Sequence, residues 1–566
     1  MPLTPAIECA AVAPEVASAR RRFSSRVVLD ALFLGTLADA LLHEGPGLGL
    51  FVWMAAFAVV LRHLVRQRGA RLTREQVGWL AAAVFFAGSF AWRDSSGLRF
   101  YNFLAMLAAL ALLGATLSHA SPMRSILGQR VRDVARALGR VAKDAASSVV
   151  ILALGDAELG DIPPAWRTGR IRAAMSASLI ALPLLVVFGI LFSAADPMFG
   201  ALFALPKMNL GEVGSHLAIA GFFTWVVGGW LRGAVVDDSA PSSRVSRAVI
   251  TLGALDVTII LGGLVALFAL FVGVQIGWLF GGERLVRSTT GLGYAQYARH
   301  GFFELVWVSL LVLPVLLGTR ASLRHGDAAA ERRHRLLAVP LIGLVGGVMA
   351  SALGRMGLYV HYYGLSTDRL FASVFMGWLA IVFAWLGLTV LRGRSRDFAA
   401  GMTVTGLLTI AMLNFANPDA LVARVNIARA RVAPTLSDSV PPIDYSYLAS
   451  SLDGDAVDHV IRALVAPPVL PATSRTRALE VRARCDAVKT LFTRWQENVP
   501  VEFPHQDLDW RLWNAAAWRA RRAVRSQEKA LRGVTCWDAG GEAAFGSREW
   551  RRPVPGEQWY VMPRQP

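Results

Sequence analysis

Long runs of apolar residues alternate with short polar stretches over most of the first 413 residues. Runs of about 20 apolar residues are long enough to cross a bilayer as helices. The pattern predicts a polytopic transmembrane helical bundle of eleven spans, although the first and third runs are short and hold polar groups, so a count of ten stays open. The predicted spans are Val27–His43, Gly47–Val65, Val77–Trp92, Phe100–Leu117, Ala173–Ala194, Val213–Leu231, Val249–Gly273, Phe302–Gly318, Leu336–Leu353, Leu370–Leu391 and Phe398–Leu413.

The pattern changes after Leu413, where shorter stretches with helical spacing of apolar residues are separated by polar segments. The predicted fold class is therefore all-α, a membrane bundle followed by a small, mainly helical C-terminal domain. In order, we expect a cytoplasmic N-terminal segment, a first transmembrane group, a basic cytoplasmic loop, a second transmembrane group and the C-terminal domain: residues 1–26, 27–117, 118–172, 173–413 and 414–566.

Local signals predict details of the C-terminal domain. Asp453 is suited to cap the second of two short helices, and Gly533 to end a later one. We expect three tryptophans to form the core of this domain, with anchoring at the membrane interface as the alternative. They are Trp510, Trp513 and Trp518.

The charge distribution predicts the orientation of the chain. Of 566 residues, 54% are hydrophobic and 17% are charged, and 58 basic against 40 acidic residues give a net charge of +18. Such a charge fits nucleic acid or the inner face of a membrane. Up to Leu413, alternate loops hold 29 basic residues when Arg62, near the inner end of the second span, is counted with them, and the loops between them hold 8. Cytoplasmic loops collect Lys and Arg. We therefore expect a cytoplasmic N-terminus, an extracytoplasmic C-terminal domain and no nucleic-acid partner.

One predicted cytoplasmic loop contains an amphipathic helix at residues 124–143. Arg and Lys cover its other faces, while its apolar positions recur at steps of four and three: Leu127, Val131, Val134, Leu138 and Val141. Such a helix is suited to lie on anionic lipids of the inner leaflet. An ordinary cytoplasmic helix packed on the protein has the same pattern, so both interpretations stay open.

Acidic residues inside the predicted spans are candidates for function, because a carboxylate at mid-bilayer costs about 2.5 to 3.5 kcal/mol on insertion scales. Asp30 and Asp39 lie in the first span, Asp256 in the seventh, and Glu304 begins the eighth. Asp256 is expected to lie deepest. The plainer interpretation is that each carboxylate lies near a helix end or pairs with another side chain.

Motifs of known chemistry are absent from the sequence. There is no Gly-rich loop ending in GK[ST], no HExxH and no GxSxG, and none of the ten histidines forms a metal-spaced pair with another on a helix. We therefore expect no catalytic residue, no cofactor and no metal site. Cys485 and Cys536 both lie in the predicted exported domain, where a disulfide between them is chemically permitted.

Four segments carry a family resemblance, and they follow one another in order: "GYAQYARHGFFELVWVSLLVLPVLL", "YYGLSTDRLFASVFMGWL", "NFANPDALVARVNIARA" and "IDYSYLASSLDGDAVDHVI". Together they resemble an uncharacterised bacterial family of multi-pass membrane proteins, domain of unknown function family 4173. The resemblance covers roughly residues 196–525. It implies a polytopic membrane protein and supplies no reaction. Taken with the other patterns, it leads us to expect a protein of the bacterial inner membrane.

The third of these segments predicts a helix where the chain leaves the membrane. Asn417 is suited to its N-cap, Pro418 to its first turn, and Asp419 to the positive end of its dipole. Asn414 stands just before it.

Polar residues farther along this helix allow two interpretations. Asn426 and Arg429 either belong to a junction helix that fastens the C-terminal domain to the bundle, or bind an anionic or polar ligand. A plain junction helix would leave Arg429 on a solvated face. A third outcome, which we favour over ligand binding, is that Arg429 is buried and paired, for example with Asp419 or Asp444, because a chain leaving the bilayer has many backbone groups to satisfy.

Taken together, these patterns indicate a non-enzymatic envelope protein with a sensing, scaffolding or regulatory role. A secondary transporter that uses intramembrane acids is the alternative, and a membrane-embedded enzyme acting on lipid or envelope substrates is the third. The bilayer is the one partner that the sequence specifies, and protein partners are not indicated.

Overall fold

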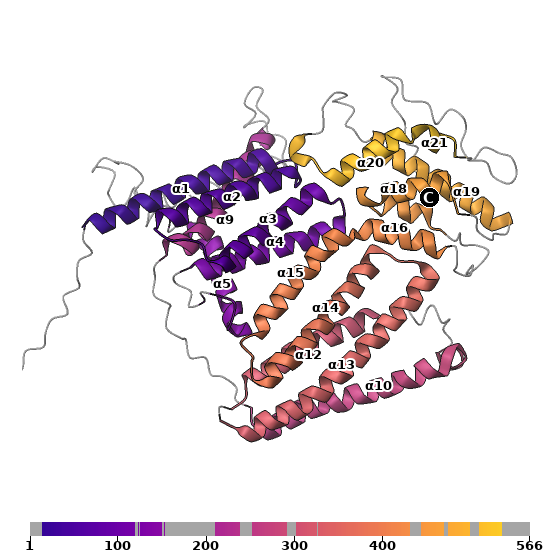
Figure 1. Ribbon diagram of the computed structural model, residues 1–566, viewed down its shortest axis with the longest axis horizontal. Helices are drawn as coiled ribbons and strands as arrows, with labels where there is room; N and C mark the ends of the chain where they lie inside the picture. The colour runs from indigo at the N-terminus through magenta and orange to yellow at the C-terminus, as the bar shows by residue number, and fades with distance from the viewer. Residues whose placement is uncertain are drawn as a thin grey trace, which may run out of the picture. The chain divides into compact units, whose positions relative to one another are not determined.

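The computed structural model describes most of the chain, and its regular structure there is helical (Figure 1). Within the described residues no strand is formed, and Leu252 and Leu323 make an isolated parallel bridge. The all-α expectation is confirmed for these residues. The described residues are 14–118, 123, 125–149, 152, 210–237, 252–290, 302–324, 326–430, 443–468, 474–497 and 509–534.

The described chain divides into two compact units. Unit 1 comprises residues 1–356, 371–416 and 506–515, and unit 2 comprises residues 357–370, 417–505 and 516–566. Unit 2 thus combines most of the predicted C-terminal domain with a segment that ends one apolar helix and begins the next.

The helices before residue 417 are long. They are α1 Pro14–Leu42, α2 Leu48–Gln67, α3 Arg74–Trp92, α4 Ser96–Leu117, α5 Val131–Ser147, α9 Leu210–Leu231, α10 Ala254–Thr290, α12 Phe302–Ala321, α13 Ala328–Tyr363, α14 Thr367–Thr389 and α15 Phe398–Ala416. Those that follow are shorter except for α19: α16 Pro418–Arg429, α17 Tyr445–Ser450, α18 Val457–Val465, α19 Ser474–Phe492, α20 Ala515–Ser526 and α21 Glu528–Arg532.

Seven helical stretches of the described chain are long and apolar enough to cross a membrane. Ten of the predicted spans overlap described helices, but α1 and α3 do not reach this apolarity, and α12 contributes only a shorter apolar stretch. The predicted span at residues 173–194 lies outside the described residues. The structure therefore supports a helical membrane protein and leaves the count of eleven unconfirmed. The seven stretches are Leu48–Gln67, Ser96–Leu117, Glu212–Val236, Ala254–Gly273, Ala328–His361, Thr367–Arg392 and Phe398–Ala416.

The main apolar cluster described in unit 1 is shared by α1 to α5 and α9, with residues of α15 at its edge. Leu34, Ala38 and Leu41 lie on one face of α1 because they are spaced by four and three residues, and all three are buried in this cluster. Gly35 permits a close approach of α9, because a Cβ at Gly35 would lie 1.9 Å from the hydroxyl oxygen of Thr224. Helices α1 and α9 therefore pack directly against each other.

The amphipathic helix of the basic loop is α5, and it packs on the protein. Val134 and Ala137 are buried in the cluster of unit 1, against α4 and α9. This favours the second of the two interpretations for its apolar face. Arg132 and Arg136 remain largely exposed on α5, so contact of its basic face with anionic lipid stays a proposal.

Unit 2 has its own core, built from α16 to α21 around the fully buried Tyr445. The pKa of Tyr445 is raised to about 12, chiefly by this burial. Gly533 ends α21 as predicted. Asp453 precedes a 3₁₀ turn at Gly454–Ala456, but its side chain does not cap that turn; it accepts a hydrogen bond from Arg494 at 3.0 Å.

The three tryptophans do not form a core, so that prediction is wrong. Trp510, Trp513 and Trp518 are 54%, 38% and 45% exposed, and small and aliphatic residues of α20 and α21 fill the core instead.

Of the two cysteines predicted to form a disulfide, the structure describes one. Cys485 is buried and disulfide-bonded. Cys536 lies outside the described residues, so the pairing of the two stays a prediction.

Candidate functional site

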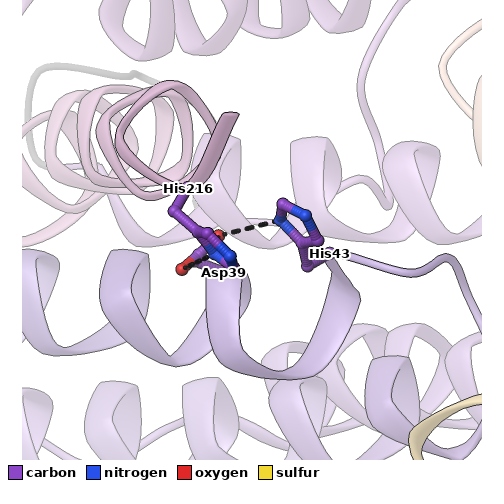
Figure 2. A group of neighbouring side chains, drawn as sticks. All are labelled: Asp39, His43 and His216. Atoms are coloured by element: carbon purple, nitrogen blue, oxygen red, sulfur yellow. Dashed lines mark hydrogen bonds and ion pairs between the residues drawn. The ribbon is translucent and has the colours of Figure 1, made fainter. Parts of the chain in front are cut away.

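Three side chains that commonly bind metal ions meet in unit 1 (Figure 2). Asp39 lies on the last turn of α1, His43 directly follows that helix, and His216 lies near the start of α9. The Nδ1 atom of His216 lies 2.9 Å from each carboxylate oxygen of Asp39. The Nδ1 atom of His43 lies 3.3 Å from Oδ1 of the same carboxylate. One ligand atom from each residue lies within 4.8 Å of the others.

Local structure brings these groups together. The backbone N–H of His43 donates to the carbonyl oxygen of Asp39 at 3.2 Å, which continues the helical turn past Leu42. Residues four apart on a helix lie on the same face, so both side chains point toward α9. The close approach at Gly35 then brings His216, two turns before Thr224, to the same place.

The cluster is partly enclosed. The rings of His43 and His216 are stacked, with centroids 3.9 Å apart and planes 15° apart. The side chains of Asp39, His43 and His216 are 18%, 19% and 44% exposed, so the carboxylate is shielded while one imidazole reaches the surface. A guanidinium, that of Arg511, donates to the carbonyl oxygen of Ala40 on the same helix.

This cluster differs from what the sequence predicts. Asp39 does lie near a helix end, as the plainer interpretation expects, but its partners are histidines, and the sequence predicts no metal site there. His216 was not a candidate, because 177 residues separate it from Asp39. The local signal was the spacing of Asp39 and His43, which places a carboxylate and an imidazole on one helical face.

Several of the predicted polar residues meet in unit 2. The Asn426 side chain accepts from the N–H of Leu365 and donates to its carbonyl oxygen, both at 2.7 Å. Gly364 allows this contact: its φ is +83°, and a Cβ there would lie 2.6 Å from the Asn426 amide oxygen. Asn426 therefore fixes the turn between α13 and α14 against α16.

Arg429 and Asp444 line the same small cavity of about 130 Å³ as Asn426. Arg429 donates to the carbonyl oxygen of His361 at 3.1 Å, and burial lowers the pKa of its guanidinium. Asp444 is the N-cap of α17 and accepts from the backbone N–H of Tyr447 at 2.9 Å. Arg429 is half-buried, and this hydrogen bond goes to a backbone carbonyl oxygen, so its predicted pairing with Asp419 or Asp444 stays a prediction.

The predicted start of α16 is confirmed. Asn417 is its N-cap and accepts from the N–H of Ala420 at 3.3 Å, with Pro418 in the first turn. Asp419 is buried in that turn and accepts from the N–H of Asp453 at 3.2 Å. These residues stabilise the helix and its neighbours within unit 2.

Asn414 lies in unit 1 and makes a different network. It is fully buried on α15, and its amide exchanges hydrogen bonds with the amide of Asn102 at 3.0 and 2.7 Å. Its carbonyl oxygen accepts from Arg93 at 2.6 Å. Asn414 thus joins α15 to α3 and α4.

Asp256 is not deep in its helix, contrary to expectation. Helix α10 begins at Ala254, so the exposed carboxylate of Asp256 lies in its first turn and accepts from the N–H of Gly253 at 2.9 Å. The predicted span begins at Val249, whereas α10 begins at Ala254, so Asp256 is nearer the helix start than predicted. Asp256 therefore has the geometry of a helix-capping residue.

A larger hollow of about 840 Å³ lies wholly within unit 2. Its charged lining consists of Arg424, Asp458, His459 and Arg462. One Arg462 nitrogen lies 3.0 Å from Nδ1 of His459. Burial chiefly lowers the pKa of His459, and Arg462 and Arg424 lower it further. Two guanidiniums against one carboxylate leave this hollow with a cationic lining.

The comparisons place the chain among proteins of unassigned activity. The profile of a family described as Domain of unknown function (DUF4153) matches residues 80–463. The chain belongs to this family. An uncharacterised family, as the resemblance implied, is thereby supported, while the number 4173 is not confirmed. No curated protein and no solved structure matches the chain.

Proposed function

We propose that this protein is a non-enzymatic sensing protein of the bacterial inner membrane, in which unit 2 binds an anionic solute or headgroup. The observation that carries the proposal is the cationic hollow of unit 2, lined by Arg424, His459 and Arg462. Its volume is in the range of small-molecule sites, which span roughly 300 to 1,000 Å³. Arginine is the side chain best suited to carboxylates and phosphates, because its planar guanidinium donates two parallel hydrogen bonds.

The sequence and the helices support the membrane part of this proposal. Seven described helical stretches are apolar enough to cross a membrane, and basic residues gather in alternate loops. On that bias the N-terminus is cytoplasmic and unit 2 extracytoplasmic. A ligand-binding unit that lies outside the bilayer and is connected to membrane helices is suited to signalling. The transporter alternative depended on acids deep in the spans, and the position of Asp256 at a helix start removes its main support.

Thermal unfolding of the full-length protein in detergent tests the anion site. Inorganic phosphate, citrate and glycerol phosphate are each added at constant ionic strength, with chloride as the reference. A ligand that binds the folded state stabilises it by about 2.7 kcal/mol at 100 times its Kd. We expect at least one of these anions to raise the melting temperature, and the double variant Arg424→Gln/Arg462→Gln to abolish that rise.

A matched control separates binding from general charge effects. Arg482 is exposed on α19 and does not line the hollow, so Arg482→Gln should keep the full response. The same variants are then tested for rescue of a deletion strain. An equal anion response in wild type and double variant would refute the site, and full rescue by the double variant would refute its role in sensing.

A further inference from the structure

We infer that Asp39, His43 and His216 form a binding site for a divalent transition metal of the zinc class. The site lies in unit 1, and it does not depend on the anion site proposed for unit 2. It supplies one carboxylate oxygen and two imidazole nitrogens, the ligand types that zinc prefers besides thiolate.

The distances from Asp39 to the two histidines fit a metal ion, and the stacked imidazoles, whose ligand atoms lie within 4.8 Å, would have to turn toward it. Ligand atoms on a tetrahedral zinc ion lie roughly 3.3 Å apart, because its Zn–N bonds are about 2.0 to 2.1 Å long. Here the carboxylate of Asp39 lies 2.9 Å from Nδ1 of His216 and 3.3 Å from Nδ1 of His43. Both histidines present the same nitrogen to the same carboxylate. A metal ion would take the place of the protons in these contacts.

A purely structural role explains only part of this arrangement. One hydrogen bond between Asp39 and His216 would join α1 to α9. The stacking of the His43 ring on His216 also joins the two helices. The contact of His43 with Asp39 does not, because both residues come from the same end of α1. It does complete a three-ligand set of the kind found at zinc sites with an open fourth position.

The donor set also narrows the class of metal. Two nitrogens and one oxygen suit zinc, copper or nickel, whereas magnesium and calcium prefer all-oxygen sites. His216 is 44% exposed, which gives an ion access from the surface, and the less exposed Asp39 supplies the negative charge. The ion would therefore bind between the last turn of α1 and the first two turns of α9.

Metal titration of the full-length protein tests this inference. The protein is purified in detergent with an affinity tag that contains no histidine, and Co²⁺ and Zn²⁺ are titrated by absorption spectroscopy and calorimetry. We expect about one equivalent of Co²⁺ to give the visible bands of tetrahedral cobalt, and Zn²⁺ to displace it. His216→Gln and Asp39→Asn should each weaken binding at least ~100-fold, because loss of a direct ligand exceeds the ~10 to 100-fold effect of an outer partner.

Two further variants make the outcome decisive. His63→Gln removes an exposed histidine of α2 outside the cluster and should bind like the wild type. His216→Cys replaces one zinc ligand with another, so it should retain binding and add a thiolate-to-cobalt charge-transfer band, even if His216→Gln fails to fold. Absence of binding by the wild type, unchanged binding by Asp39→Asn, or a His216→Cys protein without the charge-transfer band would overturn the inference.

Discussion

At the scale of single residues, Asn426 shows how one side chain can fix two distant segments. Its side-chain amide pairs with both backbone groups of Leu365, much as a neighbouring strand would. The amide oxygen accepts from the Leu365 N–H, and the amide nitrogen donates to the Leu365 carbonyl oxygen. A buried group of this kind is worth most when every atom is paired. The family resemblance includes Asn426, and this contact gives a structural reason for an amide at that position.

The variant Asn426→Asp isolates the donor of that amide. A carboxylate has the same shape, but it would place an oxygen opposite the carbonyl oxygen of Leu365. We expect unfolding free energy to fall by at least ~2 kcal/mol, since a buried group is left unpaired and charged. Chemical denaturation of the full-length protein, followed by tryptophan fluorescence, measures this loss.

A control substitution on the same helix shows how much a harmless change alters the unfolding free energy. Ala428 is exposed on α16, so Ala428→Ser should change stability by no more than about 0.5 kcal/mol. Acidification should restore part of the stability of Asn426→Asp, because a protonated carboxyl can donate to Leu365 again. Stability equal to that of Ala428→Ser would show that Asn426 does not hold the turn.

Residues such as Asn426 also show what a sequence can predict at this scale. Its type and its place on a helix indicated a hydrogen-bonded polar group. Its partner, 61 residues earlier, is set by tertiary packing that no local pattern contains. The same limit applies to His216, whose partner Asp39 is separated from it by several helices. Asn417 is easier to interpret, because a cap acts on its own helix. The capping role of Asp444 is not among the predictions, which place it only as a possible partner of Arg429.

At the scale of elements, the start of α16 depends on one residue with an uncommon backbone conformation. Asn417 has φ of +56°, and within the described chain it is the one non-glycine residue with positive φ. Asn adopts this region more readily than most residues, because its side chain can form local hydrogen bonds. The cap therefore combines a side-chain hydrogen bond with a backbone turn.

Two substitutions at Asn417 separate these contributions. Both Asn417→Ala and Asn417→Gly remove the cap and the hydrogen bond to Asp455. Only alanine adds strain, because a left-handed conformation costs an L-residue roughly 1 to 2 kcal/mol. We expect Asn417→Ala to be less stable than Asn417→Gly by about 1 kcal/mol in denaturant unfolding. Equal stability of the two variants would mean that the backbone rearranges when the cap is lost.

The sequence predicts which stretches form helices better than it predicts where those helices begin and end. Ten predicted spans overlap described helices, because long apolar runs carry a strong signal. The start of α10 was placed five residues too early, and this alone made Asp256 seem deep. Hydropathy averages over a window, whereas a helix begins where a side chain such as that of Asp256 satisfies the first backbone N–H groups.

At the scale of the whole molecule, the charge bias and the helices lead to one topology. The described chain holds seven stretches apolar enough to cross a membrane, and the sequence predicts eleven spans in all. An odd number places the two ends of the bundle on opposite faces. Since the basic residues divide 29 to 8 between alternate loops, the N-terminus is the end expected in the cytoplasm.

Reporter fusions at two positions test this topology in cells. A reporter that is active only after export should be active when fused after Asn414, and inactive when fused within the basic loop at residues 118–172. A reporter that fluoresces only in the cytoplasm should give the opposite pair of results, so each position controls the other. Full cytoplasmic fluorescence after Asn414 would place unit 2 inside. It would contradict either the odd span count or the cytoplasmic N-terminus, because the 29 to 8 division assumes all eleven predicted spans. The anion site would then face cytoplasmic solutes, whereas the predicted disulfide between Cys485 and Cys536 would lose its oxidising compartment.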